Sequence, residues 1–237
     1  MNETDFYERL DLKKEMMPAL IYFAAYMTYL FFSLENEFWH WVTLVIIPFF
    51  LLYSFHKLAR PSVSLRWTLA SIGLKKENLT AGLGWAILLG LLLSAAQLFL
   101  SRSSEAIWQI IRSGKVAYLF PLTFLMMLGL AGFTEEFFFR GILQTRLSQS
   151  LRSNLWGVVA TAVLFGFYHL PYAYLNPHWP SHGDWNAAIS AAFSQGGLGG
   201  LILGTVYVKS KNNLLACIIV HSLINAFPAM TMIKFSR

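Results

Sequence analysis

The chain has 237 residues, of which 56% are hydrophobic and only 13% are charged, and its formal net charge is +6. An average soluble domain is about one quarter charged, so this composition excludes both a disordered chain and an ordinary soluble enzyme. The Lys and Arg residues do not alternate with aromatic side chains as they do on nucleic-acid surfaces, and their excess is typical of the cytoplasmic loops of a membrane protein.

Seven apolar stretches follow the polar N-terminal residues, and each is close to or longer than the length that crosses about 30 Å of hydrocarbon as a helix. The fourth stretch is unusually long, so the count stays at seven or eight helices. The pattern predicts an all-α polytopic transmembrane bundle that forms a single membrane domain over residues 1–237. The stretches lie at residues 17–34, 39–55, 79–101, 116–148, 155–174, 187–208 and 213–233.

The distribution of Lys and Arg predicts the orientation of these helices. Both residues gather before the first stretch, between the second and third, and between the sixth and seventh, whereas the loops at 34–38 and 174–186 contain neither. Because short cytoplasmic loops carry this excess, we expect the N-terminus in the cytoplasm. The loop before the fourth stretch breaks the alternation with Arg102, Arg112 and Lys115, where an isoleucine-rich segment is typical of an interfacial amphipathic helix.

Small residues recur at every fourth position in the third and sixth stretches. This spacing places each set on one side of a helix, where two helix backbones can approach closely. We predict that both sets are packing surfaces, made by Gly82, Ala86, Gly90 and Ser94 in the third stretch and by Gly196, Gly200 and Gly204 in the sixth.

Ionisable side chains inside the apolar stretches are few, and in a bilayer such groups are costly unless they are paired or functional. We expect six polar residues to carry most of the chemistry that takes place in the membrane. They are Glu135, Glu136 and Arg140 in the fourth stretch, His169 in the fifth, and His221 and Asn225 in the seventh.

The two acidic residues of the fourth stretch are expected to have different roles. Glu136 and Arg140 are four residues apart, so on an α-helix they face one another and can form an ion pair that offsets the cost of burying both charges. Glu135 is rotated by about 100° on such a helix, and its own neighbour at the next turn is Phe139. A buried carboxylate without a cation on its own helix is a candidate general base.

The histidines are expected at the same depth as Glu135. Counted from a turn near Ser150, Glu135 lies about 15 residues before it and His169 about 19 residues after it, so an antiparallel helix pair brings both to one level. His221 and Asn225 are four residues apart, so they share one helix face and can supply two hydrogen-bond donors to a developing oxyanion.

Three motifs therefore stand in order on three apolar stretches. In this order they closely resemble the motifs of the CAAX prenyl protease type II family, also called the CPBP or abortive-infection family of CAAX proteases and bacteriocin-processing enzymes. The resemblance covers approximately the C-terminal half of the chain, which we interpret as catalytic core helices at 116–237, preceded by N-terminal helices at 1–115 that carry no comparable motif. The motifs are EExxxR with Glu135, Glu136 and Arg140, FxxxH with Phe165 and His169, and HxxxN with His221 and Asn225.

The resemblance implies an intramembrane glutamic endopeptidase of helical architecture, and we expect no cofactor. The residues matching Glu135 and His169 would activate a water molecule, and those matching His221 and Asn225 would form the oxyanion hole. Since water must reach this set, we expect an intramembrane polar cavity. Supporting positions of the motifs are matched by Glu136, Arg140 and Phe165.

Two alternatives stay open. A zinc protease could use Glu135, His169 and His221 as ligands and Glu136 as the base, although the HExxH motif is absent. A membrane scaffold or immunity protein could bind a peptide or a partner helix without turnover. Metal analysis separates the first alternative from a glutamic protease, and the activity of Glu135→Ala or His169→Ala variants separates the second.

The expected partners are the lipid bilayer and a peptide or lipidated protein substrate, with no nucleic acid. A compact chain without a sorting extension favours the plasma membrane of a prokaryote, and we expect the active site to open toward the cytoplasm. No motif indicates whether the substrate is prenylated or what the oligomeric state is.

Overall fold

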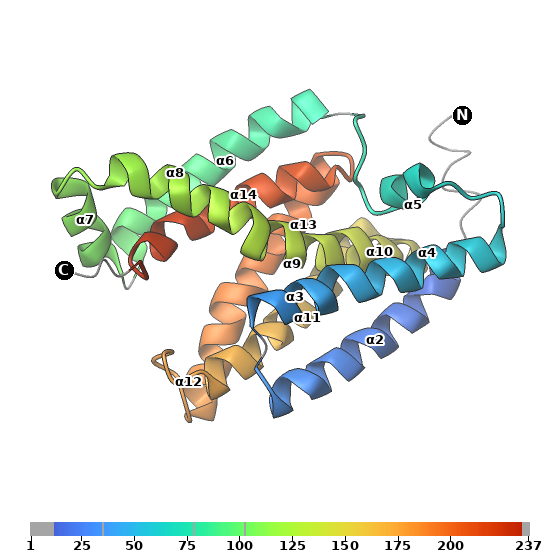
Figure 1. Cartoon of the computed structure of the whole chain (residues 1–237), viewed down its shortest axis with the longest axis horizontal. Helices are drawn as coiled ribbons and strands as arrows, with labels where there is room; N and C mark the ends of the chain where they lie inside the picture. The colour runs from blue at the N-terminus through green and yellow to red at the C-terminus, as the bar shows by residue number, and fades with distance from the viewer. Residues whose placement is uncertain (1–11, 35, 78, 102, 234–237) are drawn as a thin grey trace. The chain divides into compact units, whose positions relative to one another are not determined.

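The regular secondary structure of the described part of the chain is helical. The computed structural model describes residues 12–34, 36–77, 79–101 and 103–233. The regular elements in these ranges are helices, and none of the described residues forms a strand (Figure 1). The predicted all-α fold is therefore confirmed.

Six helical stretches of the described chain are long and apolar enough to cross a membrane, and a further apolar helix, α14 (Leu214–Met230), is shorter. These correspond one to one with the seven predicted stretches, and the long fourth stretch is one continuous helical run. The chain is a multi-pass integral membrane protein. The six long stretches are Lys14–Phe32, Phe38–Ala59, Gly82–Leu100, Val116–Ser150, Asn154–Leu175 and Trp185–Lys209.

The chain divides into two compact units, each built from two separate parts of the sequence. Unit 1 consists of residues 1–72 and 137–205, and the helix α13 (Leu198–Lys209) begins in it. Its other described elements are α2 (Leu12–Phe32), α3 (Glu37–Trp41), η1 (Val42–Ile46), α4 (Ile47–Ala59), α5 (Leu65–Ser71), η3 (Phe137–Gln144), α10 (Thr145–Ser150), α11 (Asn154–Leu175), α12 (Trp185–Ala191) and η4 (Ala192–Gly197).

Unit 2 consists of residues 73–136 and 206–237. In it α14 packs along α6 and α8, as Figure 1 shows, and also contacts the segment that leads to the acidic pair. The division into N-terminal and core helices made above stays a prediction. Besides α14, the described elements of unit 2 are α6 (Leu79–Leu100), α7 (Ser104–Arg112), α8 (Val116–Met127), η2 (Leu128–Phe133) and α9 (Thr134–Glu136).

Both stripes of small residues are packing surfaces, as predicted. In unit 2, a Cβ atom on Gly90 of α6 would lie 2.5 Å from the Leu223 side chain of α14. In unit 1, a Cβ atom on Gly200 of α13 would lie 2.8 Å from Cα of Ala162 on α11. Glycine at these positions lets the helix backbones approach closely, as is common in membrane helix pairs.

The long run Val116–Ser150 is not a regular α-helix. It contains two π-helical segments, η2 and η3, on either side of the short α9 that carries the acidic pair. In a π-helix the hydrogen bonds run from residue i+5 to residue i, so each turn is wider than in an α-helix, and such segments are frequent at functional sites. The spacing rules of an α-helix therefore do not hold directly after Glu136.

The predicted amphipathic helix before the fourth stretch is present as α7. Its Ile107 is fully buried and packs in one cluster with Leu119 of α8 and Met230 of α14. Arg112 lies at its C-terminal end and is exposed, in keeping with an amphipathic helix. Arg102, which the sequence analysis counted in the same loop, lies outside the described residues.

Candidate active site

The acidic pair of the fourth stretch and the histidine of the seventh lie together inside unit 2. Glu135 and Glu136 are 8% and 0% exposed, and His221 on α14 is 6% exposed. The Nδ1 atom of His221 lies 2.6 Å from Oε1 of Glu136, which is a hydrogen-bond distance. The Nε2 atom of His221 lies 3.7 Å from Oε2 of Glu135. One imidazole ring thus lies between two buried carboxylates.

The hydrogen bond to Glu136 determines the orientation of the His221 ring. An ionised carboxylate can only accept hydrogen bonds, so Nδ1 of His221 donates to Glu136. This contact fixes the ring orientation and directs Nε2 to the side of Glu135. The imidazole thus has Nδ1 toward Glu136 and Nε2 toward Glu135.

Close packing at Gly132 brings α14 near the acidic pair. A Cβ atom at this position would lie 2.9 Å from the carbonyl oxygen of Ile218, and closer still to the hydroxyl oxygen of Ser222. Gly132 stands about one turn before the acidic pair, and Ser222 directly follows His221. The missing side chain therefore allows two backbones to approach closely enough for the short Glu and His side chains to meet.

Asn225 lies one turn beyond His221 on α14 and is half-buried. The helix lacks one backbone hydrogen bond here, because Pro228 has no N–H group to donate to the carbonyl of Ile224. The side chain of Gln97 on α6 supplies the donor instead, with Nε2 2.7 Å from the Ile224 oxygen. This contact holds the part of α14 that carries Asn225.

The FxxxH motif lies on α11 in unit 1. Nδ1 of His169 lies 2.8 Å from the carbonyl oxygen of Phe165, one turn earlier, and donates to it, since a carbonyl can only accept. In the neutral ring Nε2 then carries the lone pair. The two rings meet edge to face with their centroids 4.6 Å apart. The orientation of His169 is therefore set by Phe165.

Arg140 of η3 belongs to the same assembly. Its guanidinium carbon lies 4.4 Å from the centre of the Phe165 ring, and its Nη2 atom donates to the carbonyl oxygen of Gly200 at 3.3 Å. The side chain is fully buried. A guanidinium over an aromatic face is a cation–π contact, which helps to compensate a buried charge.

A glycine of the sixth stretch supports His169 from the other side. A Cβ atom on Gly196 of η4 would lie 2.7 Å from Nδ1 of His169 and 3.0 Å from the carbonyl oxygen of Phe165. Any side chain at this position would press on the hydrogen bond that orients the imidazole. The periodicity of small residues predicted packing here, but it did not predict that the packing partner is His169.

The predicted site residues thus fall into two sets. Glu135, Glu136, His221 and Asn225 belong to unit 2, whereas Arg140, Phe165 and His169 belong to unit 1. That the two sets meet at one water molecule stays a prediction, and so does the ion pair between Glu136 and Arg140. The hydrogen bond between Glu136 and His221 was not predicted, because α-helical spacing pairs Glu136 only with residues of its own helix.

The zinc alternative needs three ligands at one point. Within each unit, the described residues include no group of three His, Cys, Asp or Glu side chains that could hold a metal ion. The proposed ligands Glu135 and His221 lie in unit 2 and His169 in unit 1.

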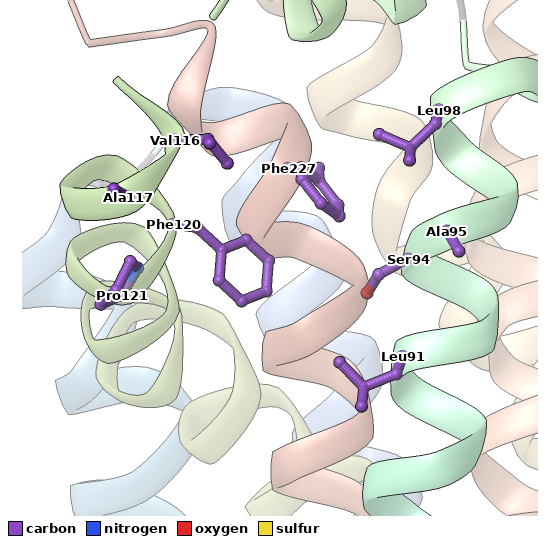
Figure 2. Close-up of a pocket in the computed structure, with 9 residues that line it drawn as sticks. All are labelled: Leu91, Ser94, Ala95, Leu98, Val116, Ala117, Phe120, Pro121 and Phe227. Atoms are coloured by element: carbon purple, nitrogen blue, oxygen red, sulfur yellow. The ribbon is translucent and has the colours of Figure 1, made fainter. Parts of the chain in front are cut away.

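Unit 2 also contains an apolar cavity of about 470 Å³ between α6, α8 and α14 (Figure 2). The hydroxyl group of Ser94 faces α14 and donates to the carbonyl of Leu223 at 2.7 Å. This cavity is apolar. The polar cavity that was predicted from the sequence stays a prediction. The lining residues are Leu91, Ser94, Ala95, Leu98, Val116, Ala117, Phe120, Pro121 and Phe227.

The helices and the buried polar groups define a multi-pass membrane protein with carboxylates and imidazoles in its interior. In a comparison with protein families, the model of the type II CAAX prenyl endopeptidase Rce1-like family matches residues 117–227. This segment is just under half of the chain and contains all seven predicted site residues, and the match supports the predicted resemblance to the CAAX protease family. No curated protein and no solved structure matches the chain.

Proposed function

We propose that the protein is a glutamate-dependent intramembrane endopeptidase in which Glu135 is the general base. The observation that carries this proposal is the position of His221 between Glu135 and Glu136 in the interior of unit 2. Peptide hydrolysis needs a base for the attacking water, donors for the oxyanion and an acid for the leaving amine. The four residues Glu135, His169, His221 and Asn225 can supply all three.

In the proposed reaction, His169 orients a water molecule through Nε2 and Glu135 takes one of its protons. The water oxygen attacks the peptide carbonyl, whose oxygen becomes an oxyanion. The Nε2–H of protonated His221 and the amide of Asn225 stabilise that charge. Glu135 then passes the proton to the leaving amine as the C–N bond breaks, which regenerates the carboxylate.

The remaining motif residues act on the orientation of these groups. Glu136 holds Nδ1 of His221 and thereby presents Nε2. Arg140 and Phe165 support the ring of His169 from within unit 1. None of the three needs to touch the substrate in this scheme.

The proposed substrate is a peptide or a lipidated protein in the membrane. The family match, to prenyl endopeptidases, supports this class. The apolar cavity in unit 2, at about 470 Å³, is of the size that small-molecule sites commonly have and is lined almost entirely by hydrocarbon (Figure 2). An aliphatic chain attached to the substrate could lie in it. We further propose a prokaryotic plasma membrane, with the N-terminus in the cytoplasm and a polar cavity opening there.

The experiment that tests this function is peptide cleavage by the purified protein in detergent. Lipidated and unlipidated peptides are offered to the wild type and to Glu135→Ala, each with and without a chelator. We expect wild-type cleavage that survives the chelator and a loss of about 10²- to 10⁴-fold in the variant, which is the usual contribution of a general base.

Each other outcome identifies one of the alternatives. Cleavage that the chelator abolishes, with stoichiometric metal in the protein, would replace this proposal with a zinc protease. Biological function retained in full by a stably inserted Glu135→Ala variant would replace it with a scaffold or immunity role.

A further inference from the structure

A second buried polar network lies in unit 1, apart from the motif residues. Glu15 of α2, His56 of α4, Thr68 of α5 and Arg146 of α10 are between 0% and 5% exposed. Oε2 of Glu15 accepts from Nε and Nη2 of Arg146 at 3.0 and 2.8 Å, and Oε1 lies 3.0 Å from Nε2 of His56. Nδ1 of His56 lies 3.0 Å from the hydroxyl oxygen of Thr68.

The donors and acceptors of this network form one consistent chain. The hydroxyl of Thr68 donates to Nδ1 of His56, the Nε2–H of His56 donates to Glu15, and Arg146 donates to Glu15 through two N–H groups. Well-packed apolar side chains often stabilise a fold as well as a buried ion pair does. Stability alone therefore does not account for four polar groups from four helices at this point.

The Nη1 group of Arg146 contacts η3, the helix that follows the acidic pair. Its Nη1 atom donates to the carbonyl oxygen of Gly141 at 2.9 Å, and the hydroxyl of the adjacent Thr145 donates to the carbonyl oxygen of Arg140 at 3.0 Å. Both carbonyls belong to the π-helical η3, and both donors stand five residues later. Five residues is the spacing that a π-helical backbone bond spans, so the two side chains brace η3 at its change into α10.

The register of η3 decides where Arg140 points. Its guanidinium packs over Phe165, and the Phe165 carbonyl in turn accepts from Nδ1 of His169. If η3 returned to α-helical spacing, the residues on its two sides would shift by one position relative to each other, and Arg140 would leave the Phe165 ring.

We propose that Glu15, His56 and Arg146 are positioning residues that lock the π-helical register of η3 and thereby orient His169. Thr68 completes the network by holding the His56 ring. This inference rests on the proposed function, in which His169 orients the attacking water. It gives a role in the reaction to the N-terminal helices α2 and α4, which carry none of the three motifs.

The test compares two double variants that each remove an ion pair. Glu15→Gln with Arg146→Gln removes the buried pair without leaving a lone buried charge, which alone could unfold the protein. Glu105→Gln with Arg112→Gln is the matched control, because that pair is 3.8 Å apart and about 70% exposed on α7. We expect the first variant to fold and to lose about 100-fold in kcat at unchanged KM, as misplacement by about 1 Å can cause. The control variant should keep wild-type kinetics.

A second readout does not depend on catalysis. The ring nitrogen signals of His169 are recorded by NMR on protein with isotope-labelled histidine and are assigned with a His169→Gln variant. These signals should shift in the buried-pair variant and stay in place in the control. A folded buried-pair variant with wild-type kcat and unshifted His169 signals would overturn the proposal. A wild-type protein without protease activity would instead overturn the proposed function, and the His169 signals would still decide whether the network positions the ring.

Discussion

At the scale of single residues, Glu135, Glu136 and His221 are three ionisable groups buried side by side. A charge in a bilayer interior is costly, and Glu135 and Glu136 are both buried. The ring of His221 meets both of them, which allows a protonated imidazole to compensate the two carboxylates. In the proposed reaction the donor to the developing oxyanion is Nε2, on the edge of the ring that faces Glu135.

Glu136 provides the first prediction. Glu136→Gln keeps the volume of the side chain but removes the charge that holds Nδ1 of His221. The donor on the opposite edge is then misaligned, and loss of one oxyanion donor costs about 10²- to 10³-fold in kcat. We expect a loss in this range with KM nearly unchanged, measured by steady-state peptide cleavage. Glu105→Gln, at an exposed position of α7, is the control, and an equal loss in both variants would contradict the role of Glu136.

At the scale of elements, the site depends on close packing between helices. Gly132 brings η2 against α14, and Gly196 brings η4 against α11. The side chains that meet at these contacts are short, so a small displacement of one helix would separate them. Neither residue has a positive φ angle, so the backbone conformation does not require glycine. Glycine is required because there is no space for a side chain.

Gly196 provides the second prediction. Gly196→Ala places a methyl group 2.7 Å from Nδ1 of His169, so the ring or the helix must move. We expect kcat to fall by about 100-fold, since misplacement of a reacting group by about 1 Å has that effect. Gly199→Ala is the matched control, because it lies three residues further along and its Cβ would meet nothing within 4 Å. Equal activity of the two variants in the cleavage assay would show that the contact at Gly196 does not orient His169.

At the scale of the whole molecule, hydropathy predicted where the membrane-spanning helices lie. The thickness of the hydrocarbon layer fixes the length of each span, so the seven stretches could be located from the sequence. The network of Glu15, His56 and Arg146 could not, because Glu15 and Arg146 are 131 residues apart and stand in no shared motif. The contact between Glu136 and His221 could not be predicted either. The two residues lie on different helices, and no spacing in the sequence indicates that these helices pack together.

The π-helical segments η2 and η3 could not be predicted from the sequence either. An apolar run of constant character, such as Val116–Ser150, gives no signal for a change from i+4 to i+5 hydrogen bonding. The α-helical rule of four predicts Arg140 beside Glu136, which stays a prediction, and it gave no sign that the guanidinium of Arg140 lies over the ring of Phe165. The motif order, by contrast, indicated the family correctly, because it depends only on residue identity along the chain.

The orientation in the membrane provides the third prediction. Cys217 is the only cysteine of the chain and is fully buried, so single cysteines added elsewhere can be labelled without background. We expect Lys76→Cys to react with a membrane-impermeant maleimide only after the cells are opened, and His178→Cys to react in intact cells, because loops rich in Lys and Arg stay in the cytoplasm. Labelling of both positions from the same side would contradict this topology.

We propose that Glu135 of unit 2 and His169 of unit 1 act on the same water molecule. A double-mutant cycle of Glu135→Ala and His169→Ala, measured as kcat for peptide cleavage, tests it most directly. We predict that each single variant loses about 10²- to 10⁴-fold and that the double variant loses no more than the worse single variant, as residues that act as one unit do. Losses that multiply in the double variant would show that the two residues act independently and would contradict a shared active site.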